Sequence, residues 1–188
     1  MTIKRLTVND ASSITNLIKS TNFEYSELNN SNSGFLLYNY GEDNYKERLK
    51  QYSHYSFGCF EGDNLVGCVL AYPLKFLKEN NEFVAHESLV FNELLSLKNQ
   101  NMVWGEQIAI LPNKRRKLYG KLLMRKIYDK MKDDNLLYFS CMVSLFPNLN
   151  KAGVNFLNSE KYYHIFKTVE ENGTVWGLFL SSKILFEK

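Results

Sequence analysis

Cysteine, proline and long apolar runs are all scarce in this chain of 188 residues. The three cysteines, Cys59, Cys68 and Cys141, are an odd number and show no CxxC or Cys/His spacing, so we expect neither a disulfide framework nor a metal site. No segment offers the ~20 uncharged residues that a membrane span needs, and no apolar stretch follows the basic start of the chain. These absences predict a cytoplasmic protein with buried, reduced thiols and no membrane partner.

Net charge is also small, at +3. That is too little for a general binder of nucleic acid, so any anion site must come from a local cluster of cations. What the chain does have is 45% hydrophobic and 14% aromatic residues, enough to fill a core. At this length we expect a single domain that spans residues 1–188.

The first half of the chain shows both strand and helix patterns. Residues 3–8, IKRLTV, alternate as a strand does, and Asp10 stands where it could cap a helix whose apolar residues follow at helical spacing. A second, short helix is expected after Asp43. Two apolar runs meet at Gly62-Asp63-Asn64, which predicts a hairpin, and an amphipathic helix through Leu89 is expected in the insertion that follows.

The second half predicts a parallel unit of strand, helix and strand. The strands are expected at 102–111 and 136–143, the helix between them at 114–132, with a right-handed crossover. A helix near Asn150 and a hairpin across Asn172-Gly173 complete the order. The fold class is therefore α/β, or α+β, with a mixed, mostly antiparallel sheet of about seven strands flanked by helices.

A cluster of four cations, Lys114 to Lys117, stands just ahead of Gly120 and of the predicted helix. The first N–H groups of a helix have no partner within it, and the macrodipole adds roughly half a positive charge there, so a pyrophosphate would suit the turn. The loops GxxxxGK and GxGxxG are absent. The alternative is a solvated helix start whose basic side chains cover apolar surface. A nucleic-acid patch would need interleaved aromatic residues and a wider basic stripe, which are missing.

Residues 106–123, EQIAILPNKRRKLYGKLL, resemble motif A of the GNAT superfamily of N-acetyltransferases, which reads RxxGxG or RxxGxA. Arg115 and Gly120 fill the outer positions, and Leu118 replaces the first glycine. The start of the chain, IKRLTVNDASSITNLI, and the segment NKAGVNFLNSEKYY are also similar to parts of the family. The resemblance therefore extends over most of the chain.

This resemblance implies that the central parallel strands splay apart and admit the pantetheine arm of acetyl-CoA. Backbone groups of Ile108 and Ile110 would pair with that arm like an added strand, and the amides that follow would hold the pyrophosphate. Leu118 departs from the family because its Cβ narrows the loop. The cofactor-binding residues implied are Ile108, Ala109, Ile110, Arg115, Arg116, Lys117, Leu118, Tyr119, Gly120, Lys121 and Asn150.

The catalytic groups implied by the family are a base and an acid. Glu106 occupies the strand position where several members carry a basic carboxylate; the alternative is a charged residue paired for structure. The tyrosine that serves as the general acid in many members falls at Leu157 in this chain. Tyr162 is therefore the candidate for the general acid, and its alternative role is packing. Asn150 could reach the cofactor or cap its helix. Cys141 is expected to be a buried thiol rather than a nucleophile.

The function implied is an acetyl-CoA-dependent N-acetyltransferase, an enzyme that transfers an acetyl group to a primary amine by direct attack with help from a general base. The alternative is a non-catalytic acyl-CoA-binding sensor or interaction module with the same fold. The partner would be a small-molecule or peptide amine, and no metal or nucleic acid is expected. The sequence leaves the identity of the amine and a homodimeric state open.

Overall fold

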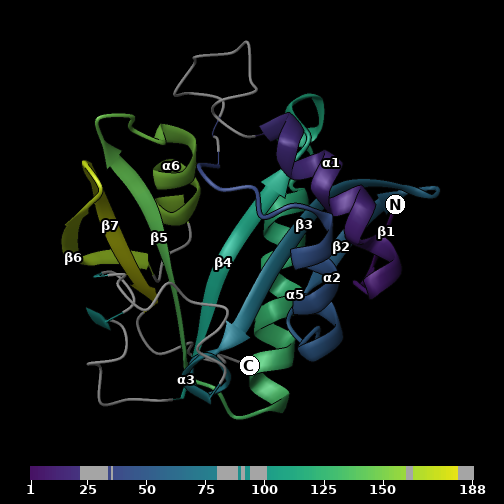
Figure 1. Ribbon diagram of the computed structural model, residues 1–188, viewed down its shortest axis with the longest axis horizontal. Helices are drawn as coiled ribbons and strands as arrows, with labels where there is room; N and C mark the ends of the chain where they lie inside the picture. The colour runs from purple at the N-terminus through teal and green to yellow at the C-terminus, as the bar shows by residue number, and fades with distance from the viewer. Residues whose placement is uncertain are drawn as a thin grey trace. The chain divides into compact units, whose positions relative to one another are not determined.

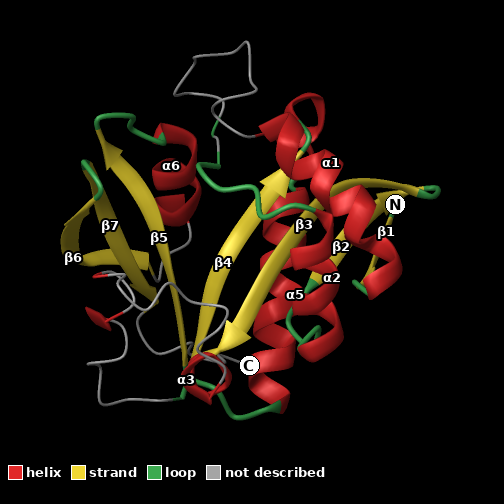
Figure 2. Cartoon of the chain, viewed as in Figure 1, coloured by secondary structure: helices red, strands yellow, loops and turns green. Residues whose placement is uncertain are grey.

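The computed structural model describes residues 1–21, 34, 36–79, 89, 92–93, 101–159 and 163–181. Figure 1 and Figure 2 show the strands and helices of the chain. The strands are β1 (Thr2–Arg5), β2 (Phe57–Glu61), β3 (Asn64–Pro73), β4 (Met102–Ile110), β5 (Tyr138–Phe146), β6 (Tyr163–Glu171) and β7 (Thr174–Ser181). The helices are α1 (Ala11–Thr21), α2 (Glu42–Gln51), α3 (Leu74–Glu79), α5 (Tyr119–Asp133) and α6 (Lys151–Ser159), with 3₁₀ turns at Val8–Asp10 and Pro112–Lys117.

The seven strands form one sheet in the order β1-β2-β3-β4-β5-β7-β6. The pairing of β4 with β5 is parallel and places residues 102–105 beside residues 138–141, whereas β1–β2, β2–β3, β5–β7 and β6–β7 are antiparallel. The predicted mixed, mostly antiparallel sheet with flanking helices is thereby confirmed. The expected separation of β4 and β5 beyond these residues stays a prediction.

The chain divides into two compact units, and the prediction of a single domain is not tested by this division. The first unit comprises residues 1–71 and 106–130. Its helices α1 and α2 lie side by side (Figure 1). The predicted apolar face of α1 is confirmed, because it is buried in a core with residues of α2, β3 and β4. Members of this core are Ala11, Ile14, Leu17, Ile18, Tyr45, Leu49, Cys68, Leu70 and Ala109.

The second unit comprises residues 72–105 and 131–188 and contains the antiparallel β6–β7 hairpin, whose register shifts between Ile165 and Lys167. Asn172 and Gly173 have φ values of 51° and 72°, the left-handed geometry that a two-residue hairpin turn requires. The hairpin predicted from Asn-Gly is therefore confirmed, as is the one at Gly62, where φ is 61°. Leu178 and Phe179 of β7 are fully buried and fill the core of this unit.

Two helix starts differ from the prediction. Asp10 does not cap α1 but ends a 3₁₀ turn, where its carboxylate accepts hydrogen bonds from the N–H and hydroxyl of Thr7 at 2.8 and 2.9 Å. The helix predicted at 114–132 is interrupted by Leu118, which is left-handed, so α5 begins only at Tyr119. Both differences arise because a 3₁₀ turn precedes the α-helix, and residue composition alone does not signal such a turn.

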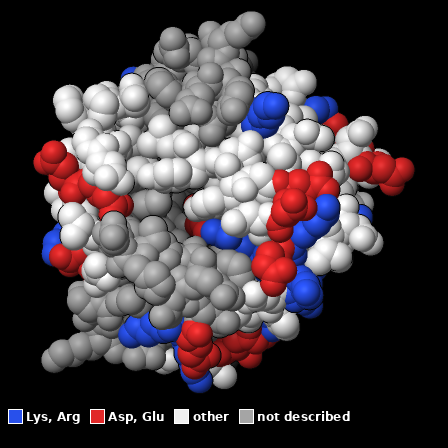
Figure 3. Space-filling view, in the orientation of Figure 1, with Lys and Arg blue, Asp and Glu red and all other residues white. Residues whose placement is uncertain are grey.

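Three further comparisons complete the fold. The helix predicted after Asp43 is confirmed as α2, and the strand predicted at 136–143 begins two residues later, as β5. The amphipathic helix predicted through Leu89 falls mostly outside the described residues. None of the helices in the described ranges has the length and apolar character to span a bilayer. Figure 3 shows acidic and basic side chains interspersed over one face, as the small net charge suggests.

Candidate functional site

A buried ion pair joins α2 to β4 inside the first unit. Arg48 donates from Nε to Glu106 Oε2 at 3.2 Å and from a terminal nitrogen, Nη2, to Oε1 at 3.1 Å. The two side chains are only 4% and 11% exposed. Two parallel N–H···O bonds of this kind are charge-assisted and fix the plane of the carboxylate. Arg48 therefore contacts both oxygens of Glu106, the residue predicted as the base.

The guanidinium of Arg48 is itself held by two further groups. The Tyr40 ring lies under it, with the guanidinium carbon 4.2 Å from the ring centroid. Asn44, one helical turn earlier in α2, accepts a hydrogen bond through Oδ1 from the other terminal nitrogen, Nη1. Burial, followed by the charge of Glu106, raises the pKa of Tyr40 above its ordinary value, so its hydroxyl stays protonated.

Gln107, the next residue of β4, ties the same helix and the segment before it to the sheet. Tyr45 donates its hydroxyl to Gln107 Oε1 at 3.0 Å, and Gln107 Nε2 donates to the carbonyl of Tyr38 at 2.8 Å. Both Tyr45 and Gln107 are buried. Burial also raises the pKa of Tyr45. The backbone around Glu106 is therefore anchored on its C-terminal side by a polar network.

The basic turn after β4 is anchored by an acid from β2. Glu61 accepts a hydrogen bond from the Tyr119 hydroxyl and pairs with the Lys114 ammonium. The hydrogen bond from Tyr119 to this carboxylate raises the pKa of Tyr119 to about 12. One carboxylate therefore holds the residues on both sides of Leu118.

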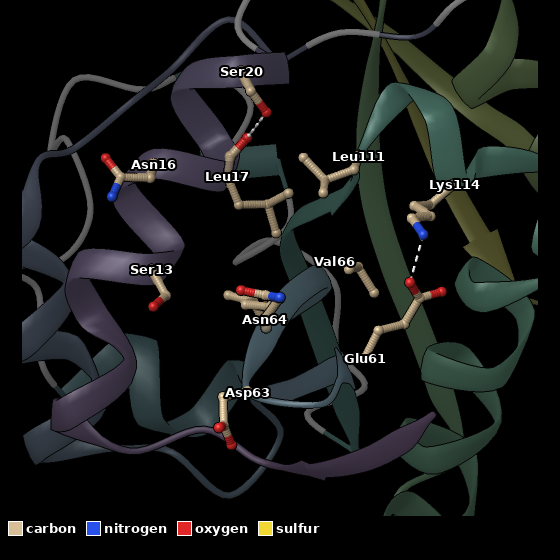
Figure 4. A pocket seen from close by; sticks show the side chains of 11 residues that line it. Ser13, Asn16, Leu17, Ser20, Glu61, Asp63, Asn64, Val66, Leu111 and Lys114 are labelled. Atoms are coloured by element: carbon tan, nitrogen blue, oxygen red, sulfur yellow. Dashed lines mark hydrogen bonds and ion pairs between the residues drawn. The ribbon is translucent and has the colours of Figure 1, made fainter.

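A pocket of ≈ 520 Å³ lies beside this anchor, between α1 and the β2–β3 turn. Figure 4 shows the contact between Lys114 and Glu61 at one wall, with Ser13, Asn16 and Ser20 of α1 opposite. The residues that line it include none of those predicted for cofactor binding or catalysis. The pocket thus marks the side on which the basic turn is fastened to the hairpin.

Most of the predicted cofactor-binding residues lie along β4 and in the basic turn that follows it. Ala109 is buried, whereas Ile108 and Ile110 are half-buried on the alternate face of the strand. The end of β4 is fastened by a hydrogen bond of 3.0 Å from the Leu111 N–H to the Val66 carbonyl. The backbone of Arg115, Arg116 and Lys117 forms the 3₁₀ turn, Leu118 is 62% exposed, and Gly120 and Lys121 lie in the first turn of α5.

The second unit contains Asn150, which was predicted to bind the cofactor, and Leu157, which stands where many family members carry a tyrosine. Asn150 caps α6, because its Oδ1 accepts a hydrogen bond of 2.9 Å from the Gly153 N–H. Leu157 is buried, so the position of the family's tyrosine is a core position here. Cys141 is half-buried rather than buried as predicted, and desolvation raises the pKa of its thiol to about 12. Tyr162 lies outside the described residues.

Sequence reasoning missed Arg48 and Glu61. Arg48 could have been found from the sequence. It lies three residues after Tyr45 and one before Leu49, on the buried face of α2, where a cation is unusual. Glu61 has no such signal, since it ends a strand next to an ordinary turn. In the described part of the chain, no cluster of His, Cys, Asp and Glu could hold a metal ion.

A mixed sheet with one parallel pair, β4–β5, flanked by helices is the fold of the acetyltransferase class. The sequence profile of the acetyltransferase (GNAT) family matches residues 22–158, so the chain belongs to that family. Its members are acetyl-CoA-dependent acetyltransferases, and the chain is an enzyme of this class. The resemblance inferred from residues 106–123 is confirmed.

Solved structures of the same fold have low sequence identity. Ard1 from Thermoplasma volcanium has a TM-score of 0.66 and 12% identity, with 95% of each chain covered. The NatC complex bound to Gag peptide and CoA has a TM-score of 0.64 and 14% identity, with 96% of each chain covered. A polyamine N-acetyltransferase from Drosophila melanogaster that forms N-acetylagmatine has a TM-score of 0.61 and 12% identity, with 95% of this chain and 98% of that one covered. No curated protein matches the chain in sequence.

Proposed function

We propose that the protein transfers an acetyl group from acetyl-CoA to a primary amine by direct attack, with Glu106 as the general base. The observation that carries this proposal is the orientation of the Glu106 carboxylate by Arg48, in the strand that runs directly into the basic turn. The acceptor is a peptide or small-molecule amine. Structural relatives that carry a Gag peptide or form N-acetylagmatine support this breadth.

The geometry of the basic turn supports its role in binding the diphosphate of acetyl-CoA. Leu118 has φ 59° and ψ 11° and follows a 3₁₀ turn, so successive N–H groups form a concave nest of the kind that binds anions. Helix α5, which is 15 residues long, begins immediately afterwards and directs the positive end of its dipole to the same place. The residues present therefore fit a diphosphate, with the amides of 116–121 as donors.

The reaction needs one proton acceptor and one proton donor. The amine nitrogen attacks the thioester carbonyl carbon, the C–S bond breaks, and the nitrogen loses a proton to Glu106, directly or through water. A carboxylate has about four lone-pair sites, and the two bonds from Arg48 occupy two of them. The departing thiolate takes its proton from water or from Tyr162.

A turnover assay tests this proposal. Purified protein is mixed with acetyl-CoA and a panel of peptide N-termini, lysine and polyamines, and released CoA thiol is measured. We expect turnover above the rate of hydrolysis with at least one amine, and Glu106→Gln should lower kcat by about 100-fold or more. Glu47→Gln, an exposed acid on α2, is the control and should leave the rate unchanged. Equal rates for wild type and Glu106→Gln would exclude Glu106 as the base.

The second candidate function is a non-catalytic acyl-CoA-binding module. It is favoured by one observation, the burial of Leu157 where many family members carry the acidic tyrosine. This function predicts binding without chemistry. Acetyl-CoA at ~100 times its Kd would add about 2.7 kcal/mol to the free energy of unfolding, while no amine of the panel would release CoA.

A further inference from the structure

We propose that Arg48 is a positioning residue for the transfer reaction, which acts by orienting the Glu106 carboxylate. The inference rests on the proposed function, because it assigns Arg48 a role only through the base. Its starting point is the bidentate contact, in which both oxygens of Glu106 are bonded to one guanidinium at 3.2 and 3.1 Å. A single point charge would leave the carboxylate free to rotate, whereas the planar fork of arginine does not.

Two groups besides Glu106 fix the orientation of the Arg48 guanidinium. Tyr40 covers one of its faces and Asn44 accepts from Nη1, which is not engaged with Glu106. These two groups come from the segment that precedes α2 and from α2 itself, so two parts of the chain direct Arg48 toward β4. Such support is what a base needs in order to stay within reach of a reacting proton.

Stability alone does not account for this arrangement. Taking two charges out of water has a large desolvation cost, and a buried ion pair can often be replaced by apolar residues of similar volume with no loss of stability. Helix α2 already has Tyr45 and Leu49 for core packing. A buried cation on the same face, bonded to the carboxylate of the proposed base, therefore points to a role in the reaction.

The test is a measurement of kcat and KM for Arg48→Met and Arg48→Lys, made with the amine that gives the highest turnover. Arg48→Met should lower kcat by about 100-fold, the effect of a misplaced catalytic group, and change KM much less. Arg48→Lys keeps the charge and loses the planar fork, so its kcat should fall as well. The Kd for CoA should be unchanged in both variants.

Lys50→Met removes an exposed cation from the same helix and is the matched control, expected to keep the wild-type kcat and KM. A double-mutant cycle with Glu106→Gln shows whether Arg48 acts through the carboxylate. In the Glu106→Gln background, Arg48→Met should have little further effect on kcat, whereas full additivity of the two losses would overturn the proposal.

Folding failure of one variant does not decide the outcome. If Arg48→Met does not fold, Asn44→Ala loosens the guanidinium while leaving both charges in place, and it should lower kcat more than KM. A folded Arg48→Lys and a folded Asn44→Ala that both keep the wild-type kcat would overturn the positioning role. Retention of activity by Glu106→Gln would instead overturn the proposed function, so the two failures are distinguishable.

Discussion

Leu118 has a backbone conformation that its side chain disfavours. Its φ of 59° lies in the left-handed region, where an L-residue with a Cβ is strained by about 1–2 kcal/mol, and its side chain is 62% exposed. Glycine removes this strain but loses more entropy on folding. We therefore expect Leu118→Gly to raise the free energy of unfolding by up to about 1 kcal/mol, measured by urea denaturation.

The matched control for this prediction is Leu118→Ala. It removes the same exposed side chain but keeps the Cβ, so it should not stabilise the protein. Identical unfolding midpoints for the glycine and alanine variants would show that the left-handed geometry carries no strain.

Tyr119 gives a prediction for alkaline pH. Its pKa is raised to about 12 chiefly by the hydrogen bond to Glu61, so the folded state retains a proton that the unfolded state loses near pH 10. The stability due to this bond is complete below pH 10 and is lost as the pH rises toward 12. The Tm of wild type should therefore fall more steeply over this range than that of Tyr119→Phe. Glu61→Gln should show the same shallow dependence as Tyr119→Phe, and a steep one would implicate another group.

At the level of single residues, the sequence indicated which residues to single out better than it indicated which residues they contact. Glu106 was predicted as a base or as a charged residue paired for structure, and the structure shows the pairing. The partner could not be assigned, because Arg48 is 58 positions away and any of several cations could have met it. Non-local pairing depends on the packing of α2 on the sheet, and no local pattern encodes it.

Among the elements, α6 separates two interpretations of Asn150. Its side chain caps the helix through Gly153, yet the sequence also assigned it to cofactor binding. If it only caps, Asn150→Ala should lower the free energy of unfolding by about 1 kcal/mol and leave the Kd for CoA unchanged. Asn150→Ser keeps a cap acceptor and should retain most of the stability. A weaker CoA affinity in both variants would show that Asn150 also contacts the cofactor.

Elements with a strong local signal were predicted well. Both hairpins follow from glycine turns, and the apolar face of α1 follows from its 3.6-residue period. The start of α5 was wrong because a leucine gives no sign of left-handed geometry, and the position could be recognised only from the glycine of the family motif. Turn chemistry is thus predictable where residue type and conformation agree, and unpredictable where they conflict.

For the molecule as a whole, three elements, β3, β4 and α5, each have residues in both units. In β4, residues 102–105 belong to the unit that contains β5, and residues 106–110 belong to the unit that contains α1 and α2. The chain passes between the units three times, so neither unit is a continuous segment. Unfolding of one unit alone would have to interrupt β3, β4 and α5 within their length, which favours one cooperative transition.

This cooperativity can be measured with acetyl-CoA as the perturbation. Its proposed contacts at 108–121 lie in the first unit, whereas both tryptophans, Trp104 and Trp176, lie in the second. At ~100 times its Kd, acetyl-CoA should add about 2.7 kcal/mol to the free energy of unfolding. In one cooperative domain, tryptophan fluorescence and far-UV circular dichroism must report the same increase in the urea midpoint. If the fluorescence midpoint stays in place while the dichroism transition splits, the two units unfold separately and the single-domain prediction is wrong.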